Sequence, residues 1–181
     1  MKKILLVVLI LIILFGLGYY AMRNDDDNRV INDPVIEDVN EEEEEEEDVV
    51  TIPIKLYYYN PDLDQGQGGI LCSSKGLVAV DRVLPDTTTP LAESIKLLLR
   101  GELTQAERAE GIETEFPLEG VTLENATISN GVATLTFNDP NNKTGGGSCR
   151  VGILLLQIEA TAKQFPTVTS VRISPADLFQ P

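Results

Sequence analysis

An uncharged apolar run near the N-terminus limits what the rest of the chain can fold into. Residues 4–22 contain no charged side chain and are rich in Leu, Ile and Val. As a helix rising about 1.5 Å per residue, the run is about 28 Å long, close to the thickness of the hydrocarbon core of a bilayer. We therefore predict a transmembrane signal-anchor over residues 1–23, which leaves only the later residues to form a water-soluble core.

The charges beside this run predict its orientation. Lys2 and Lys3 precede it, whereas Arg23 alone follows it. The positive-inside rule then places the N-terminus in the cytoplasm and the C-terminal domain outside, in a single-pass protein of the cell membrane. The alternative is a cleaved signal peptide, although no clean Ala-x-Ala site follows the run. Either reading places residues 24–181 outside the cytoplasm.

Residues 24–50 are predicted to be an acidic, disordered linker. Residues 24–48 hold 14 acidic side chains and one basic side chain, a net charge of −13 that includes the unbroken run Glu41 to Glu47. Such a segment cannot bury enough apolar surface to offset its conformational entropy, and self-repulsion extends it. The alternative is an acidic tail that binds calcium or a partner.

Composition excludes several classes of function. The chain contains no histidine, which removes Ser-His-Asp catalysis and His-ligated metal centres. Its net charge of −15, with no basic tract, disfavours nucleic-acid binding. We find no motif for a cofactor, a metal or a catalytic nucleophile, and we expect a protein that is not an enzyme. If the protein were an enzyme, its catalytic groups would be carboxylate pairs such as Asp62 and Asp64, as in a glycosidase.

Residues 51–181 read as one α+β domain. Residues 52–59 alternate apolar and polar side chains like a strand, and residues 77–84 form a second extended segment. Two amphipathic helices are predicted, one after Thr89 and one after Ser148, with a capping box at Thr104 between them. Residues 168–173 read as a last strand. We expect a two-layer domain with an antiparallel or mixed sheet and both helices on one face.

The clearest local signal is a hairpin. Asn130-Gly131 is the preferred pair for a two-residue type I′ turn. It pairs Ser129 with Val132 and places the apolar side chains of both strands on one face, with threonines on the other. Leu123 falls on the wrong face, which predicts either a bulge or the end of the strand there.

Cys72 and Cys149 lie in a compartment where thiols oxidise, and neither belongs to a Cys-x-x-Cys motif. A disulfide between them would join two glycine-rich loops. Two separate buried thiols, or a reactive thiolate at Cys149 near a helix N-terminus, are the alternatives.

Three consecutive tyrosines end the first predicted strand and must point to both of its faces. Tyr58 continues the apolar face. Tyr57 and Tyr59 either pack under the loops or form an exposed contact surface.

In their order and spacing, several short motifs over residues 52–173 resemble the GerMN domain, a sporulation and spore-germination module of bacterial envelope proteins. The motifs are Ile54-Lys55-Leu56-Tyr57-Tyr58-Tyr59, Val80-Asp81-Arg82-Val83, Leu98-Leu99-Arg100-Gly101, Thr104-Gln105-Ala106-Glu107-Arg108, Asn130-Gly131-Val132-Ala133 and Gln164-Phe165-Pro166-Thr167-Val168. The resemblance implies a small α+β fold similar to ring-building motifs, a membrane-tethered setting and no catalytic residue. Glu102 departs from the usual pattern, in which a proline follows the glycine.

The expected function is protein–protein contact in a cell-envelope assembly, with other envelope proteins or with further copies of the chain in a ring or other homo-oligomer. The alternative is a module that binds cell-wall glycan or another small ligand through Tyr57, Tyr59 and the glycine loops.

Overall fold

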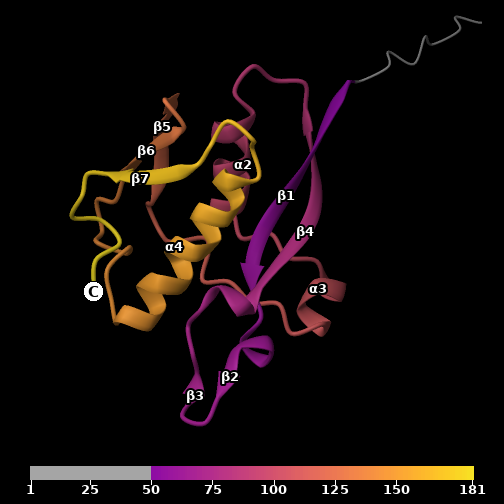
Figure 1. The fold of residues 1–181 in the computed structure, drawn as a ribbon, viewed down its shortest axis with the longest axis vertical. Helices are drawn as coiled ribbons and strands as arrows, with labels where there is room; N and C mark the ends of the chain where they lie inside the picture. The colour runs from indigo at the N-terminus through magenta and orange to yellow at the C-terminus, as the bar shows by residue number, and fades with distance from the viewer. Residues whose placement is uncertain (1–49) are drawn as a thin grey trace, which may run out of the picture. The chain divides into compact units, whose positions relative to one another are not determined.

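The computed structural model describes residues 50–181 (Figure 1). The predicted anchor at residues 4–22 and almost all of the predicted acidic linker lie outside these residues. Within residues 50–181, no helix is long and apolar enough to cross a membrane.

Strands and helices are interspersed along the described chain. In order they are β1 (Thr51–Tyr59), the 3₁₀ helix η1 (Pro61–Asp64), β2 (Gln65–Gly66), β3 (Gly69–Ile70), η2 (Ser74–Gly76), β4 (Leu77–Pro85), α2 (Pro90–Leu99), α3 (Gln105–Ala109), β5 (Thr122–Ser129), β6 (Val132–Asn138), α4 (Ser148–Lys163) and β7 (Ser170–Ser174).

The α+β class is confirmed, but the prediction of one sheet with both helices on one face is wrong. β1 and β4 form one antiparallel pair, β2 and β3 a short ribbon, and β5, β6 and β7 a separate mixed sheet in which β7 runs parallel to β6. Helices α2 and α4 lie between the two larger sheets (Figure 1). The reason lies in α2. Its predicted apolar stripe is Leu91, Ile95, Leu98 and Leu99, but Leu97 is buried as well, so the helix must be covered on two sides.

The predicted hairpin is confirmed residue by residue. Asn130 and Gly131 have φ values of 50° and 80°, as a type I′ turn requires. Ser129 pairs with Val132, and the register shifts between Leu123 and Asn125, which is the predicted bulge. The shift lets Leu123 point into the core opposite Phe137.

The helix ends follow local chemistry. Thr104 accepts a hydrogen bond from the Glu107 amide, and the Glu107 carboxylate accepts one from the Thr104 amide, which confirms the capping box. The prediction that Ser148 caps α4 is wrong. Ser148 is the first residue of the helix, because Gly147 takes the extended conformation of an N-cap residue.

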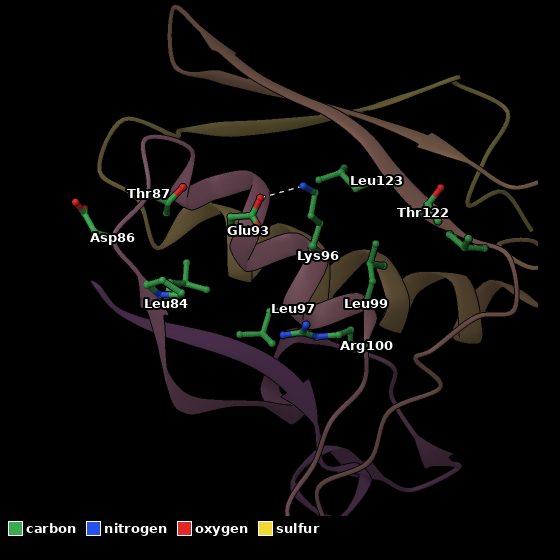
Figure 2. Close-up of a pocket in the computed structure, with 12 residues that line it drawn as sticks. Leu84, Asp86, Thr87, Glu93, Lys96, Leu97, Leu99, Arg100, Thr122 and Leu123 are labelled. Carbon is green, nitrogen blue, oxygen red and sulfur yellow. Dashed lines mark hydrogen bonds and ion pairs between the residues drawn. The ribbon is translucent and has the colours of Figure 1, made fainter. Parts of the chain in front are cut away.

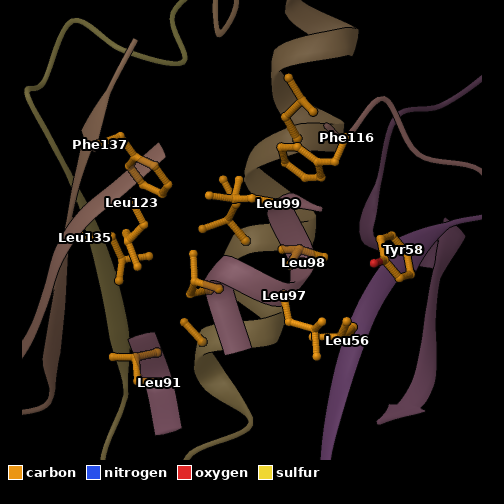
Figure 3. Packing of buried hydrophobic residues seen from close by; sticks show 14 of the residues in the cluster. Leu56, Tyr58, Leu91, Leu97, Leu98, Leu99, Phe116, Leu123, Leu135 and Phe137 are labelled. Carbon is orange, nitrogen blue, oxygen red and sulfur yellow. The ribbon is translucent and has the colours of Figure 1, made fainter. Parts of the chain in front are cut away.

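The core fills the space between the two sheets. Ile95 and Leu98 of α2 are fully buried, with Leu56 and Tyr58 of β1 on one side and Leu135 of β6 on the other (Figure 3). The β1–β4 pair therefore lies on one side of the helices. The outer edge of β1 contacts α4, whereas the outer edge of β4 lies beside a groove.

Candidate functional site

The outer edge of β1 is closed by side chains of α4 and by one backbone bridge. The Lys55 amide donates to Gln164 Oε1 at 2.7 Å, and Gln164 Nε2 donates to the Lys55 carbonyl at 2.8 Å. The Tyr57 amide donates to Thr161 Oγ1 at 3.1 Å, and Tyr59 exchanges two backbone hydrogen bonds with Glu113. Polar side chains of a helix thus take the place of a neighbouring strand.

The outer edge of β4 is open. The backbone groups of Lys55 and Tyr57 bond to α4 and so point away from β4. Their cross-strand partners Asp81 and Ala79 must then point theirs away from β1, and so must Val83, two residues further along and opposite Pro53. The amides of Ala79, Asp81 and Val83 therefore face outward, and they have no hydrogen-bond partner among residues 50–181. The Val83 side chain is 64% exposed. An edge of this kind is a template for pairing with another strand.

A groove of about 570 Å³ runs along this open edge. Leu84 and Leu97 give it apolar walls, and Arg100 and Glu102 line it from the end of α2 and the turn that follows. A strand added to β4 would therefore place alternate side chains in the groove between β4 and α2.

A second, wider groove of about 750 Å³ continues from it over the outer face of α2 to the start of β5 (Figure 2). The two grooves share Leu84, Pro85, Leu97 and Arg100. On the exposed face of α2, Lys96 pairs with Glu93 at 2.9 Å. Acidic and basic side chains balance along both grooves, in contrast to the acidic character of the chain as a whole.

An ion pair connects β4 to α3. The Arg82 guanidinium donates to both carboxylate oxygens of Glu107, at 2.7 and 2.8 Å, and to the Glu102 carbonyl at 3.0 Å. The hydrogen bond from Arg82 lowers the pKa of Glu107 to about 2, against the opposing effect of burial. The same hydrogen bond raises the pKa of Arg82. The pair holds the turn after α2 beside the open edge.

Acid should therefore weaken the fold through Glu107. Its pKa of about 2 is below the usual value of 4.5 for a glutamate, so the folded state favours the charged carboxylate. The resulting stabilisation, about 1–2 kcal/mol, is complete above pH 4.5 and is lost as the pH falls from 4.5 toward 2. Glu107→Gln should flatten this part of the stability curve in urea titrations at different pH values. Glu110→Gln, at an exposed carboxylate three residues away, should leave the curve unchanged.

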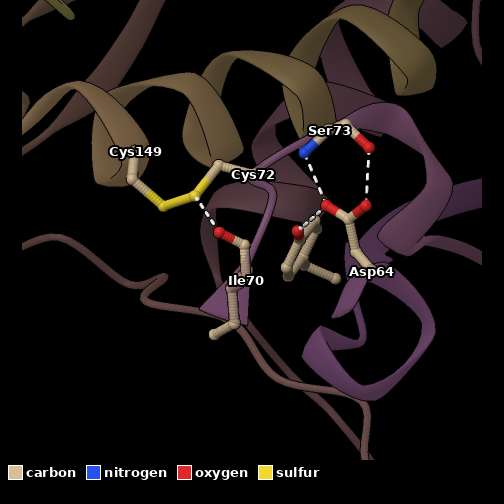
Figure 4. The surroundings of a disulfide bond; sticks show 6 residues. Asp64, Ile70, Cys72, Ser73 and Cys149 are labelled. Atoms are coloured by element: carbon tan, nitrogen blue, oxygen red, sulfur yellow. Dashed lines mark hydrogen bonds between the residues drawn. A yellow bond between two sulfur atoms is a disulfide. The ribbon is translucent and has the colours of Figure 1, made fainter. Parts of the chain in front are cut away.

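A buried carboxylate organises the loop between β1 and β4. Asp64 is 1% exposed, and its oxygens accept hydrogen bonds from the Tyr59 hydroxyl and from both the amide and the hydroxyl of Ser73, the latter two at 2.6 Å (Figure 4). Burial opposes ionisation of Asp64, but these hydrogen bonds outweigh it, so the pKa of Asp64 lies below its usual value. Burial, followed by the hydrogen bond to Asp64, raises the pKa of Tyr59 to about 12.

The two cysteines meet beside this carboxylate. Cys72 and Cys149 are joined in a disulfide, with their Cα atoms 5.3 Å apart (Figure 4). The bond connects the loop after β3 to the first turn of α4.

The structure separates the two tyrosines proposed as a contact surface. Tyr59 is 4% exposed and donates to Asp64, so its side chain is part of the loop's interior and offers no surface. Tyr57 is half-buried. Tyr59 therefore follows the packing alternative and not the contact-surface alternative, because its hydroxyl donates to the buried Asp64.

The carboxylate pair Asp62 and Asp64 lines neither of the two grooves. Asp64 is buried and accepts hydrogen bonds from Tyr59 and Ser73. Within residues 50–181, no group of three or more Cys, Asp or Glu side chains is placed to hold a metal ion. The open edge of β4 is the feature that the sequence analysis missed. Its one signal was Arg82, a charged residue at an inward-facing position of a strand.

Comparisons with known proteins agree with this fold. The family model named Germane, described as sporulation and spore germination, matches residues 55–176. The structure of the tandem GerMN domains of the sporulation protein GerM from Bacillus subtilis is 20% identical, with a TM-score of 0.51, covering 85% of this chain and 45% of that one. This chain thus spans less than half the length of that structure. No curated protein matches.

Two further solved structures are more distant. The first GerMN domain of the same Bacillus subtilis protein is 18% identical, with a TM-score of 0.48, covering 70% of this chain and 86% of that one. A putative lipoprotein from Clostridium perfringens is 13% identical, with a TM-score of 0.33, covering 69% of this chain and 76% of that one. Because the family model spans most of the described residues, the chain belongs to the Germane family of sporulation and spore-germination domains.

Proposed function

We propose that this protein is a membrane-tethered, extracytoplasmic and non-catalytic module that docks other proteins of a bacterial cell-envelope assembly. The observation that carries the proposal is the open edge of β4, whose outward amides at Ala79, Asp81 and Val83 lie beside a groove. An extended segment of the partner would add to β4 through main-chain hydrogen bonds, and the groove would select its side chains. The partner is another envelope protein or a further copy of this chain.

The disulfide supports the extracytoplasmic location. Disulfides form and persist in oxidising compartments and are rare in the cytosol. The bond between Cys72 and Cys149 is therefore consistent with a domain that lies outside the cytoplasm, beyond the anchor predicted at residues 4–22.

A proline substitution tests the edge directly. The Val83 amide has no partner within residues 50–181, so Val83→Pro should cost the fold little while removing one donor from the docking edge. Val83→Thr is the matched control, because it retains the amide. Both variants should be made in the full-length chain and expressed in its native host.

The readout is photo-cross-linking from a reactive amino acid placed at Ala79. We expect a defined protein adduct in the parent and in Val83→Thr. Its yield should fall about two- to tenfold in Val83→Pro, because one main-chain hydrogen bond worth about 0.5–1.5 kcal/mol is lost. An adduct of equal yield in Val83→Pro would contradict docking at this edge. Retention of the protein on purified cell-wall material, with no protein adduct, would favour the glycan-binding alternative.

A further inference from the structure

Exposed apolar side chains gather at one end of the domain. We call residues 63–71, which run from η1 through β3, the tip. Leu63, Ile70 and Leu71 of the tip are 58%, 47% and 53% exposed. The other large exposed apolar side chains among residues 50–181 are Val50, Val83 and Ile128, each in a different strand or at a strand end. The tip thus concentrates apolar surface that the core does not use.

The tip and the residues that follow it also lack charge. Residues 65–74 contain no Asp, Glu, Lys or Arg, in a domain whose residues 49–181 carry 15 acidic and 10 basic side chains. The one carboxylate within the tip, Asp64, is buried and hydrogen-bonded to Tyr59 and Ser73. Bringing Ile70 and Leu71 against an apolar phase would therefore require no charge within residues 65–74 to lose its water, whereas Leu63 follows the exposed Asp62.

The tip is held in place before it meets a partner. The disulfide from Cys72 fastens the end of the tip to α4, and Asp64 fastens its beginning to Tyr59 and Ser73 (Figure 4). The β2–β3 ribbon projects from the domain at the end away from the start of β1 (Figure 1). A fixed projection loses little conformational entropy when it binds.

We propose that the tip inserts Leu63, Ile70 and Leu71 into the interfacial layer of a lipid bilayer. The proposal rests on the proposed membrane tether, because the tether keeps the domain close to a bilayer. Residues 23–49 can extend to about 90 Å, at about 3.3 Å per residue, which exceeds the dimensions of a domain of this size. The tether keeps the tip at a high effective concentration near the bilayer, so even a weak second hydrophobic contact can form.

Charge and area favour lipid over a protein partner at this place. The linker and the domain both carry net negative charge, whereas residues 65–74 carry none. The tip is therefore the part of the domain that a negatively charged bilayer surface repels least. Three side chains on a convex ribbon are far short of the 1,200 Å² or more that a stable protein interface buries, which argues against self-association through the tip.

The absence of tryptophan from the chain allows a direct test. Full-length protein with Leu71→Trp is reconstituted into phosphatidylcholine vesicles, and Ile70→Trp provides a second reporter at the tip. Ile128→Trp on β5 is the matched control, because Ile128 is 43% exposed and lies outside both the tip and the β4 edge. We expect blue-shifted emission that acyl-chain-brominated lipids quench for both tip reporters, and water-like emission for the control. Adding Leu63→Ser to Leu71→Trp should reduce the inserted fraction about tenfold.

Other outcomes overturn the proposal. Emission from position 71 that resembles that of the Ile128→Trp control, in protein that floats with the vesicles, refutes insertion of the tip while leaving the anchor standing. Failure to float refutes both the anchor and the insertion. A blue shift that appears only with native membranes, and not with pure lipid, assigns the tip to a protein partner instead. Docking at β4 is tested separately by the cross-linking from Ala79.

Discussion

Removal of the disulfide should lower the free energy of unfolding by about 4 kcal/mol. The bond between Cys72 and Cys149 closes a loop with a sequence separation of 77 residues, and in the chain-entropy model a loop of that size restricts the unfolded chain by about this amount. The double variant Cys72→Ser/Cys149→Ser should therefore unfold at a temperature about 15 °C lower, as measured by calorimetry or circular dichroism.

Reductant provides the control for this prediction. It should lower the unfolding temperature of the parent protein toward that of the double variant, and it should leave the double variant unchanged. A double variant that unfolds at the temperature of the parent would show that Asp64 and its partners hold the loop without the disulfide. Because the loop includes the tip, reduction should also increase amide exchange at Ile70 and Leu71.

Gly101→Ala should destabilise the fold by about 3 kcal/mol. Gly101 ends the turn after α2 with a φ of 65°, where a side chain is strained. A Cβ atom at this position would lie 1.8 Å from the carbonyl oxygen of Phe116, a backbone atom that cannot move aside alone. Strain and overpacking therefore add, and urea titration should show a lower midpoint with an unchanged slope.

Gly68→Ala is the matched substitution for this comparison. Nothing lies within 4 Å of a Cβ atom at Gly68, and its φ is outside the left-handed region. The substitution should be neutral or stabilise the protein by about 0.5 kcal/mol, because alanine restricts the unfolded chain. Equal effects of the two substitutions would contradict the close approach of Gly101 to Phe116.

Local features of the fold could be predicted because their causes lie within a few residues of one another. The type I′ turn needs only Asn130 and Gly131, and the capping box needs only Thr104 and Glu107. Alternation along β1 identified its buried face, on which Ile54, Leu56 and Tyr58 are at most 4% exposed.

The candidate site could not be predicted in the same way, because its parts come from distant segments. Gln164 closes the edge of β1 from 109 residues away along the chain, and Thr161 does so from 104 residues away. A glutamine and a threonine at the end of an amphipathic helix carry no sign of that role. The open edge of β4 is visible only once the other edge is known to be closed.

The sequence by itself determined the class of the domain, the hairpin register and the capping box at Thr104, because periodicity and short-range hydrogen bonds specify them. Only the tertiary structure decided that two sheets enclose α2 and α4, that Tyr59 turns inward to Asp64, and that β4 rather than β1 keeps a free edge. These outcomes depend on which surfaces pack together once chain entropy has been overcome. The packing of these surfaces is determined by the total apolar area that the whole domain buries, and no local sequence pattern predicts that total.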